Sequence, residues 1–277
     1  MSPQPAAGGS LKVRTLSACV FVPGILLLAH AGGGWLLALV ALIVGRSSWE
    51  LFAMARTAGS RAGAGLGSGL ALGVCLLAFV SGARHLVPFL LGATLLVMAA
   101  ELPRGTAGYA ARTGLVLGGV LYTGLLGSAP LLIAHAAGPG RQQACGRLLG
   151  LLFLCIWLTD ALAYLAGRRF GRRKLVPSIS PAKTVCGAAA GLAGGLLPGL
   201  LWRYVPCLTC GQLVGLLCCA SVAGQTGDLV ESALKRDFGV KDAPALIPGH
   251  GGALDRFDSY LFAFPVAYLY LQALAVF

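Results

Sequence analysis

Charged residues are scarce in this chain. They make up 11% of its 277 residues, whereas soluble domains carry about 25%, so there is too little polar surface to cover a water-soluble globule. Disorder is excluded as well, because disordered segments combine high charge with low hydrophobicity and 57% of these residues are apolar. The chain is therefore expected to fold in a lipid environment.

Long apolar segments are what the sequence has instead. Spanning a bilayer takes roughly 20 mostly apolar residues, and the glycines, 41 in number, suit close helix–helix contact in lipid. The first apolar stretch is divided at Gly32-Gly33-Gly34, a pattern that breaks a helix. We predict an all-α, polytopic integral membrane protein with about nine transmembrane helices, at residues 14–31, 35–55, 62–82, 85–101, 113–137, 148–167, 185–203, 209–231 and 258–276.

The basic residues predict orientation and partners. The net charge is +12, and with nine spans and a cytoplasmic N-terminus most Lys and Arg residues lie in inside segments, as the positive-inside rule requires. They flank apolar segments and do not line one polar face, which favours anionic lipids and phosphate-bearing substrates over nucleic acid as partners. No nucleic-acid binding is expected.

The acidic residues are concentrated toward the C-terminus. The chain has nine of them, and only Glu50 and Glu101 precede residue 160; the others are Asp160, Asp228, Glu231, Asp237, Asp242, Asp255 and Asp258. Carboxylates in or beside apolar spans are costly and tend to mark sites, although ordinary interfacial ion pairs would explain Asp237 and Asp242 equally well. We therefore divide the chain into an N-terminal transmembrane region, 1–145, of about five helices and a C-terminal catalytic region, 146–277, of about four helices with cytoplasmic polar loops.

Two acidic clusters flank a basic loop in the C-terminal region. Asp228, Glu231 and Lys235 share one helix face by their i, i+3, i+7 spacing, and Asp255 shares a face with Asp258 in the same way. Such clusters at one membrane depth suit a hard cation, because Mg²⁺ is usually held by one or two carboxylates, waters and substrate phosphates. The sequence thus predicts a magnesium site.

The loop between these clusters carries groups that bind phosphate. Lys235, Arg236 and Lys241 supply charge and hydrogen-bond donors. The glycines around His250 would let backbone N–H groups approach an anion, although Pro-Gly-His-Gly-Gly is equally a flexible turn.

A second polar stretch follows the sixth expected span. Ser180, Lys183 and Thr184 offer two hydroxyls and an ammonium group at the expected start of the next helix, where the helix dipole also favours anions. The preceding Arg run, from residue 168, fits a topology signal and a lipid-headgroup anchor.

The cysteines do not predict a metal centre. Most are isolated within apolar runs, where Cys acts as a small hydrophobe. Cys207 and Cys210 form a single C-x-x-C without a second pair or a nearby His, so zinc is not expected and a local disulfide fits better.

Several of these residues belong to one extended pattern. The chain reads Ser232-x-x-Lys235-Arg236-x-x-x-x-Lys241-Asp242 and then Pro248-Gly249-His250-Gly251-Gly252-x-x-Asp255-Arg256-x-Asp258. It also contains Gly227-Asp228-Leu229, Asp160-Ala161-x-Ala163-Tyr164 and Ser180-Pro181-x-Lys183-Thr184. From about residue 150 onward the sequence resembles the phosphatidate cytidylyltransferase family, whereas only Glu50 and general hydrophobicity resemble it before that point.

The resemblance implies a function and a set of residue roles. Members of that family are helical membrane enzymes with about nine spans, use Mg²⁺ and are often dimeric. They transfer CMP from CTP to phosphatidic acid. A bacterial inner-membrane enzyme, with a homodimer as one expected assembly, is therefore predicted.

Carried over by position, Asp228 and Asp255 would be the metal carboxylates and Asp258 would support them. The triphosphate and lipid phosphate would be bound by Lys235, Arg236, Lys241, His250 and Arg256. Asp160, Ser180, Lys183 and Thr184 would complete the polar cavity.

One departure and two alternatives stay open. The family usually has Glu where this chain has Cys186, which removes a carboxylate from the expected edge of the cavity. A CTP-dependent kinase of a polyprenol or phytol-type alcohol would use similar groups, and a cation transporter could also place acids in the membrane. The sequence lacks the G-x-x-x-x-G-K-[ST] phosphate loop and the Asp-Gly pair that opens a CDP-alcohol transferase signature.

Overall fold

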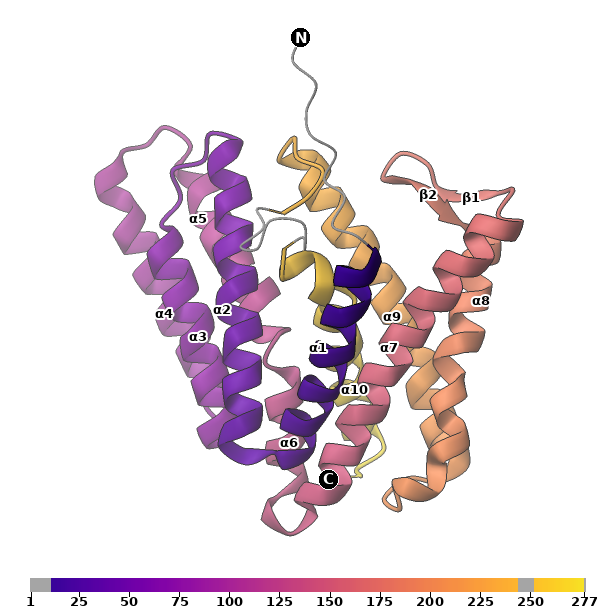
Figure 1. Ribbon diagram of the computed structural model, residues 1–277. Helices are drawn as coiled ribbons and strands as arrows, with labels where there is room; N and C mark the ends of the chain where they lie inside the picture. The colour runs from indigo at the N-terminus through magenta and orange to yellow at the C-terminus, as the bar shows by residue number, and fades with distance from the viewer. Residues whose placement is uncertain (1–10, 244–251, 277) are drawn as a thin grey trace.

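The computed structural model describes residues 11–243 and 252–276, and side chains from residue 21 onward except that of Pro139. Its α-helices are α1 (Leu11–Ala31), α2 (Gly33–Thr57), α3 (Ala64–Ser81), α4 (Leu86–Glu101), α5 (Tyr109–Gly119), α6 (Ala129–Ala137), α7 (Gln142–Phe170), α8 (Val185–Leu196), α9 (Cys210–Asp237) and α10 (Leu254–Ala273). Short 3-10 helices cover Leu102–Arg104, Pro139–Arg141 and Leu197–Tyr204, and a π-helix covers Val120–Leu125. The expected all-α class is confirmed (Figure 1).

The helices confirm a membrane protein but not the expected number of spans. Within the described residues, six helices are long and apolar enough to cross a bilayer, or up to seven if α5, the π-helix and α6 form one broken span. Each predicted span has a helical counterpart. Within the residues whose side chains are described, α1 counts as a shorter apolar helix, Phe21–Ala31, and α10 is not among the qualifying helices.

The boundary between α1 and α2 lies where the sequence predicts it. Gly32 and Gly33 have φ angles of 66° and 51°, a left-handed conformation that glycine adopts without steric cost. The span expected at 113–137 is not one continuous helix, because its two halves are bent by 43° relative to each other. Pro130 opens α6, and a proline cannot donate the hydrogen bond that would continue the preceding helix.

Glycines bring α7 and α8 into close contact. A Cβ atom added to Gly187 would lie 2.7 Å from the Ala163 carbonyl oxygen, and one added to Gly191 would lie 2.9 Å from that of Thr159. Small residues at such an interface allow backbones to approach in lipid. Helix α8 in turn contacts α9, so these three helices form one packed group.

A short β-hairpin joins α7 to α8. Strands β1 (Lys174–Val176) and β2 (Ser180–Thr184) are antiparallel, with Lys174 opposite Thr184. Thr184 caps α8, because its hydroxyl accepts a hydrogen bond from the Gly187 N–H at 3.1 Å. Thr184 thus lies at the start of the helix, as expected, whereas Ser180 and Lys183 precede it in β2.

Helix α10 contacts helices from both the earlier and the later part of the chain. It packs against α9 and also against α2, α6 and α7. The buried Tyr260 stacks on Phe153 of α7, with ring centroids 5.9 Å apart, and donates a hydrogen bond to the Gly127 carbonyl oxygen at 2.6 Å. The β-hairpin, the C-terminal end of α9 and the beginning of α10 lie toward the same end of the bundle (Figure 1).

Candidate active site

A polar cavity of about 660 Å³ lies between α7, the β-hairpin, α8 and α9. Its lining includes five of the predicted site residues, namely Asp160, Ser180, Lys183, Thr184 and Asp228. The cavity thus brings together residues from three separate segments of the signature.

An ion pair connects the hairpin to α9 inside this cavity. Lys183 Nζ lies 2.8 Å from Asp228 Oδ2, and the two side chains are 24% and 36% exposed. The hairpin makes this pair possible, because β2 places Lys183 in the lining of the cavity together with Asp228 of α9. Asp160 of α7 repels Asp228 and is attracted by Lys183, so the single ammonium group serves two carboxylates.

A second ion-paired group lies between α9 and α10. Lys235 Nζ lies 2.6 Å from Asp255 Oδ1 and also pairs with Glu231, whose side chain is 1% exposed. This lysine joins the two acidic clusters that the sequence placed on separate helices. The sequence predicts one helix face that carries Asp228, Glu231 and Lys235. In the structure this face has two sets of partners, since Asp228 pairs with the hairpin and Lys235 pairs with α10.

Asp255 also holds the backbone beside it. Its Oδ2 accepts hydrogen bonds from the N–H groups of Ala243 and Gly252, at 3.1 and 3.2 Å. Both oxygens therefore have partners, and the carboxylate fixes the chain at two points just outside residues 244–251.

Asp258 contributes negative charge to the same region. It is buried, and its Oδ1 accepts a hydrogen bond from the Ser259 N–H at 2.5 Å. Asp228, Glu231 and Asp160 all repel it. Several carboxylates thus face one another with two lysines between them, an arrangement that attracts a cation.

The predicted basic residues are not all in the cavity. Arg236, Lys241 and Arg256 are exposed at the ends of α9 and α10, and none of them lines it. His250 lies outside the described residues, so its role stays a prediction. Cys186 is exposed and does not line the cavity, which places the missing family carboxylate outside it. Cys207 and Cys210 are free thiols, so the local disulfide that fitted their spacing better than a zinc site is not formed.

The N-terminal half supplies residues that the sequence interpretation did not assign to the site. Glu50 of α2 is 1% exposed, and its Oε2 accepts a hydrogen bond from the Leu254 N–H at 2.7 Å. Tyr122, in the π-helix, packs edge-on against Phe262 of α10 and interacts electrostatically with Glu231, Asp258 and Asp228. The sequence held one signal that could have pointed to Glu50 as a site residue, because Glu50 is one of only two acids before residue 160.

The site suits a cation that the substrate helps to hold. Among the described residues, no three His, Cys, Asp or Glu side chains form a group that could hold a metal ion alone. Mg²⁺ does not need such a group, because it keeps several waters and uses one or two carboxylates together with phosphates. Asp228 and Asp255 each pair with a lysine, so either carboxylate could bind the metal by exchanging its ammonium partner.

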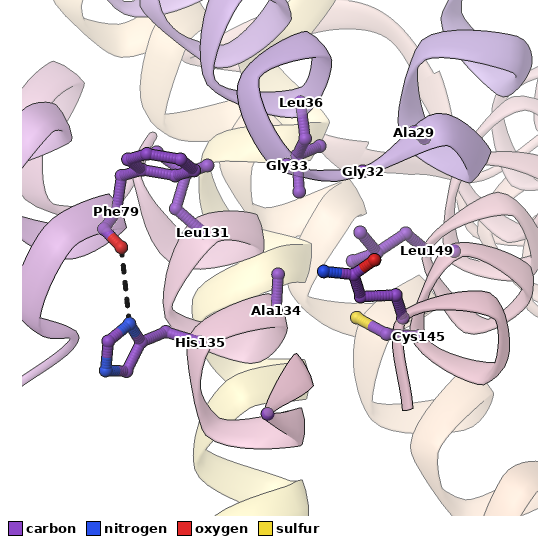
Figure 2. A pocket seen from close by; sticks show the side chains of 13 residues that line it. Ala29, Gly32, Gly33, Leu36, Phe79, Leu131, Ala134, His135, Cys145 and Leu149 are labelled. Atoms are coloured by element: carbon purple, nitrogen blue, oxygen red, sulfur yellow. Dashed lines mark hydrogen bonds between the residues drawn. The ribbon is translucent and has the colours of Figure 1, made fainter. Parts of the chain in front are cut away.

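A second cavity, of about 310 Å³, lies beside the α1–α2 turn and is lined by residues of α1, α2, α3, α6 and α7. Most of its lining is apolar. His135 Nδ1 lies 3.2 Å from the Phe79 carbonyl oxygen at its edge (Figure 2). None of the predicted site residues lines this cavity, so the chemistry is assigned to the polar cavity.

Fold and site define a helical membrane protein with a cavity lined by both acidic and basic side chains. Comparison with known proteins agrees: the model of the cytidylyltransferase family matches residues 12–274, and the chain belongs to that family.

Curated relatives carry a more specific name. The chain is 50% identical over 118 residues to a phosphatidate cytidylyltransferase of Bacillus subtilis, an alignment that covers 42% of this chain and 44% of the relative. A protein of the same name from Staphylococcus aureus (strain COL) is 48% identical over 116 residues, covering 41% and 45%. One from Synechocystis is 47% identical over 130 residues, covering 45% and 43%. The match thus spans less than half the length of each of these relatives.

Proposed function

We propose that this protein is a phosphatidate cytidylyltransferase, which transfers CMP from CTP to phosphatidic acid and releases pyrophosphate. The observation that carries the proposal is the polar cavity, where Lys183 pairs with Asp228 beside Asp160 in a chain of the cytidylyltransferase family. Relatives that carry this enzyme's name match at 47–50% identity. A bacterial inner-membrane location, a cytoplasmic N-terminus and a homodimer belong to the same proposal.

The reaction needs charge neutralisation and positioning more than a base. A phosphate oxygen of phosphatidic acid is already anionic at neutral pH. It attacks the α-phosphorus of CTP, a new P–O bond forms, and the bond between the α- and β-phosphates breaks as pyrophosphate leaves. The barrier is mainly repulsion between anions, which fixed positive groups lower.

The residues of the cavity, and those of the ion-paired group between α9 and α10 outside its lining, have distinct tasks in this scheme. Lys183 and Ser180 bind phosphate oxygens from the hairpin side, while Arg236, Lys241, Arg256 and His250 remain proposed phosphate contacts of the neighbouring loop. Bound at Asp228 and Asp255, with Asp258 in support, Mg²⁺ would act as a Lewis acid that neutralises the phosphates. Lys235 keeps Asp255 in place through their 2.6 Å ion pair.

The test uses the full-length protein purified in detergent. Supplied with labelled CTP, Mg²⁺ and phosphatidic acid, it should form lipid-linked CMP and pyrophosphate in equal amounts, and EDTA should stop both until Mg²⁺ is added back. The Asp228→Asn variant is the matched control and should lose both products together. Release of CDP with an alcohol substrate would instead show a lipid kinase, and absence of both reactions in folded protein would refute the proposal.

A further inference from the structure

Helix α10 receives its N-terminal hydrogen-bond acceptor from a helix far away in the sequence. The Leu254 N–H, at the first position of α10, donates to Glu50 Oε2 at 2.7 Å. The first turn of a helix has N–H groups without partners inside the helix, and Ala253, which precedes α10, provides no side-chain hydrogen bond. Glu50 therefore does for α10 what a capping residue normally does, and its charge also interacts favourably with the helix dipole.

The position of this contact matters because the predicted metal carboxylate is adjacent to it. Asp255 follows Leu254 directly, and Asp258 lies one turn further along α10. A shift or rotation of the first turn would therefore move both carboxylates. Asp255 in turn accepts hydrogen bonds from the N–H groups of Ala243 and Gly252. A movement of Asp255 would therefore also move the backbone at these two residues.

Glu50 is itself held rigidly. Arg46 Nε lies 2.9 Å from Glu50 Oε1, and the Arg46 guanidinium lies 4.3 Å from the centre of the Trp49 ring. On the other side, a Cβ atom added to Gly252 would lie 2.6 Å from Glu50 Oε2. The carboxylate thus fills the space above the start of α10, and a side chain at residue 252 would displace it.

We propose that Glu50 is a positioning residue of the active site, which sets the placement of Asp255 and Asp258 by capping α10. The inference rests on the proposed function for its kinetic consequences. Glu50 touches no reacting atom in this scheme; it acts through the backbone of Leu254 and is oriented by Arg46.

The matched control is a second buried carboxylate on the N-terminal side. Glu101 is 0% exposed, accepts the Gly63 N–H at 2.9 Å and pairs with Arg104 and Arg112. Glu101 resembles Glu50 because it is buried and paired with arginine, but among the described residues none of its hydrogen bonds or ion pairs joins it to α10. Glu50→Ala, Glu50→Gln and Glu101→Gln are therefore compared in the purified full-length protein.

Two readouts separate positioning from general destabilisation. In Glu50→Ala we expect the Mg²⁺ concentration for half-maximal activity to rise about tenfold and kcat to fall about tenfold, since a buried hydrogen bond to a charged group is lost. The KM for phosphatidic acid should change less than about twofold. Hydrogen–deuterium exchange of the peptide covering residues 252–258 should accelerate about tenfold, because the Leu254 amide loses its acceptor. Glu50→Gln should lie between the wild type and Glu50→Ala, since an amide oxygen still accepts.

The outcomes distinguish the two hypotheses. Glu101→Gln should lower the melting temperature while leaving both the Mg²⁺ dependence and the exchange of residues 252–258 unchanged. If Glu50→Ala behaves in the same way as Glu101→Gln, the positioning role is refuted. If the wild type makes no lipid-linked CMP but the exchange differs as expected, the capping role stands and the proposed function fails.

Discussion

Replacing Lys235 by Met tests the ion-paired group between α9 and α10 directly. Lys235 is 14% exposed and serves both Glu231, which is 1% exposed, and Asp255, which is 19% exposed. Methionine has a similar length but no charge, so two carboxylates would be left facing each other without a cation. Removing one partner of a buried ion pair costs about 3–5 kcal/mol.

That loss should be visible as a change in thermal stability. For a chain of this size it corresponds to a fall in melting temperature of about 6–20 °C, measured in detergent by intrinsic fluorescence or by a thiol-reactive dye. The proposed transfer of CMP to phosphatidic acid should fall by at least about a hundredfold at a temperature where the variant is folded, because Asp255 loses its orienting partner.

A double variant tests whether the unpaired carboxylates cause the loss of stability in Lys235→Met. Adding Glu231→Gln to Lys235→Met removes one of the two uncompensated charges, so about half of the lost stability should return, whereas the transfer activity should not. Lys235→Arg keeps the charge and should remain close to the wild type in stability. A melting temperature for Lys235→Met within about 2 °C of the wild type would refute the assigned cost of leaving these carboxylates unpaired.

Three further substitutions test other features. Lys183→Ala removes the cavity's ion pair with Asp228; because that pair is partly exposed, stability should change by less than about 1 kcal/mol, whereas turnover should fall at least about a hundredfold, and a large loss of melting temperature would contradict this. Cys186→Glu should alter turnover by less than about twofold, since the residue is exposed and does not line the cavity; a strong gain of activity would show that the family carboxylate matters here. Gly191→Leu should destabilise the protein by about 1–3 kcal/mol, read as a lower melting temperature, because its side chain would meet the Thr159 carbonyl at the α7–α8 contact, and unchanged stability would contradict that packing.

Much of the architecture could be predicted from composition and local pattern. Charge scarcity and apolar runs indicate membrane helices, and a glycine triplet marks the turn that Gly32 and Gly33 make with positive φ. The bend between α5 and α6 is harder to foresee. A single Pro130 in an apolar run is compatible with a continuous helix, and the tertiary packing of the π-helix against α3 is invisible in the sequence.

The candidate site was predictable where its residues are local in sequence. Periodicity placed Glu231 one turn from Lys235, and the structure pairs them. It could not show that Lys183 would reach Asp228 from a β-hairpin, because Ser-Pro-x-Lys-Thr reads equally well as the start of a helix. Nor could it place Glu50 against Leu254, since that contact joins residues 204 positions apart.

The pairing of Glu50 with Arg46 also bears on how the chain is assembled in the membrane. Glu50 lies in α2 and Leu254 in α10, so α2 is synthesised long before its partner exists. The i, i+4 pair with Arg46 forms as soon as α2 is helical, and it neutralises a carboxylate that would otherwise be costly in the bilayer. When α10 is inserted, the second oxygen of Glu50 is available for its first turn. The candidate site is therefore completed only when α10 docks, and a chain truncated before α10 would carry the Glu50 carboxylate without the helix that it caps.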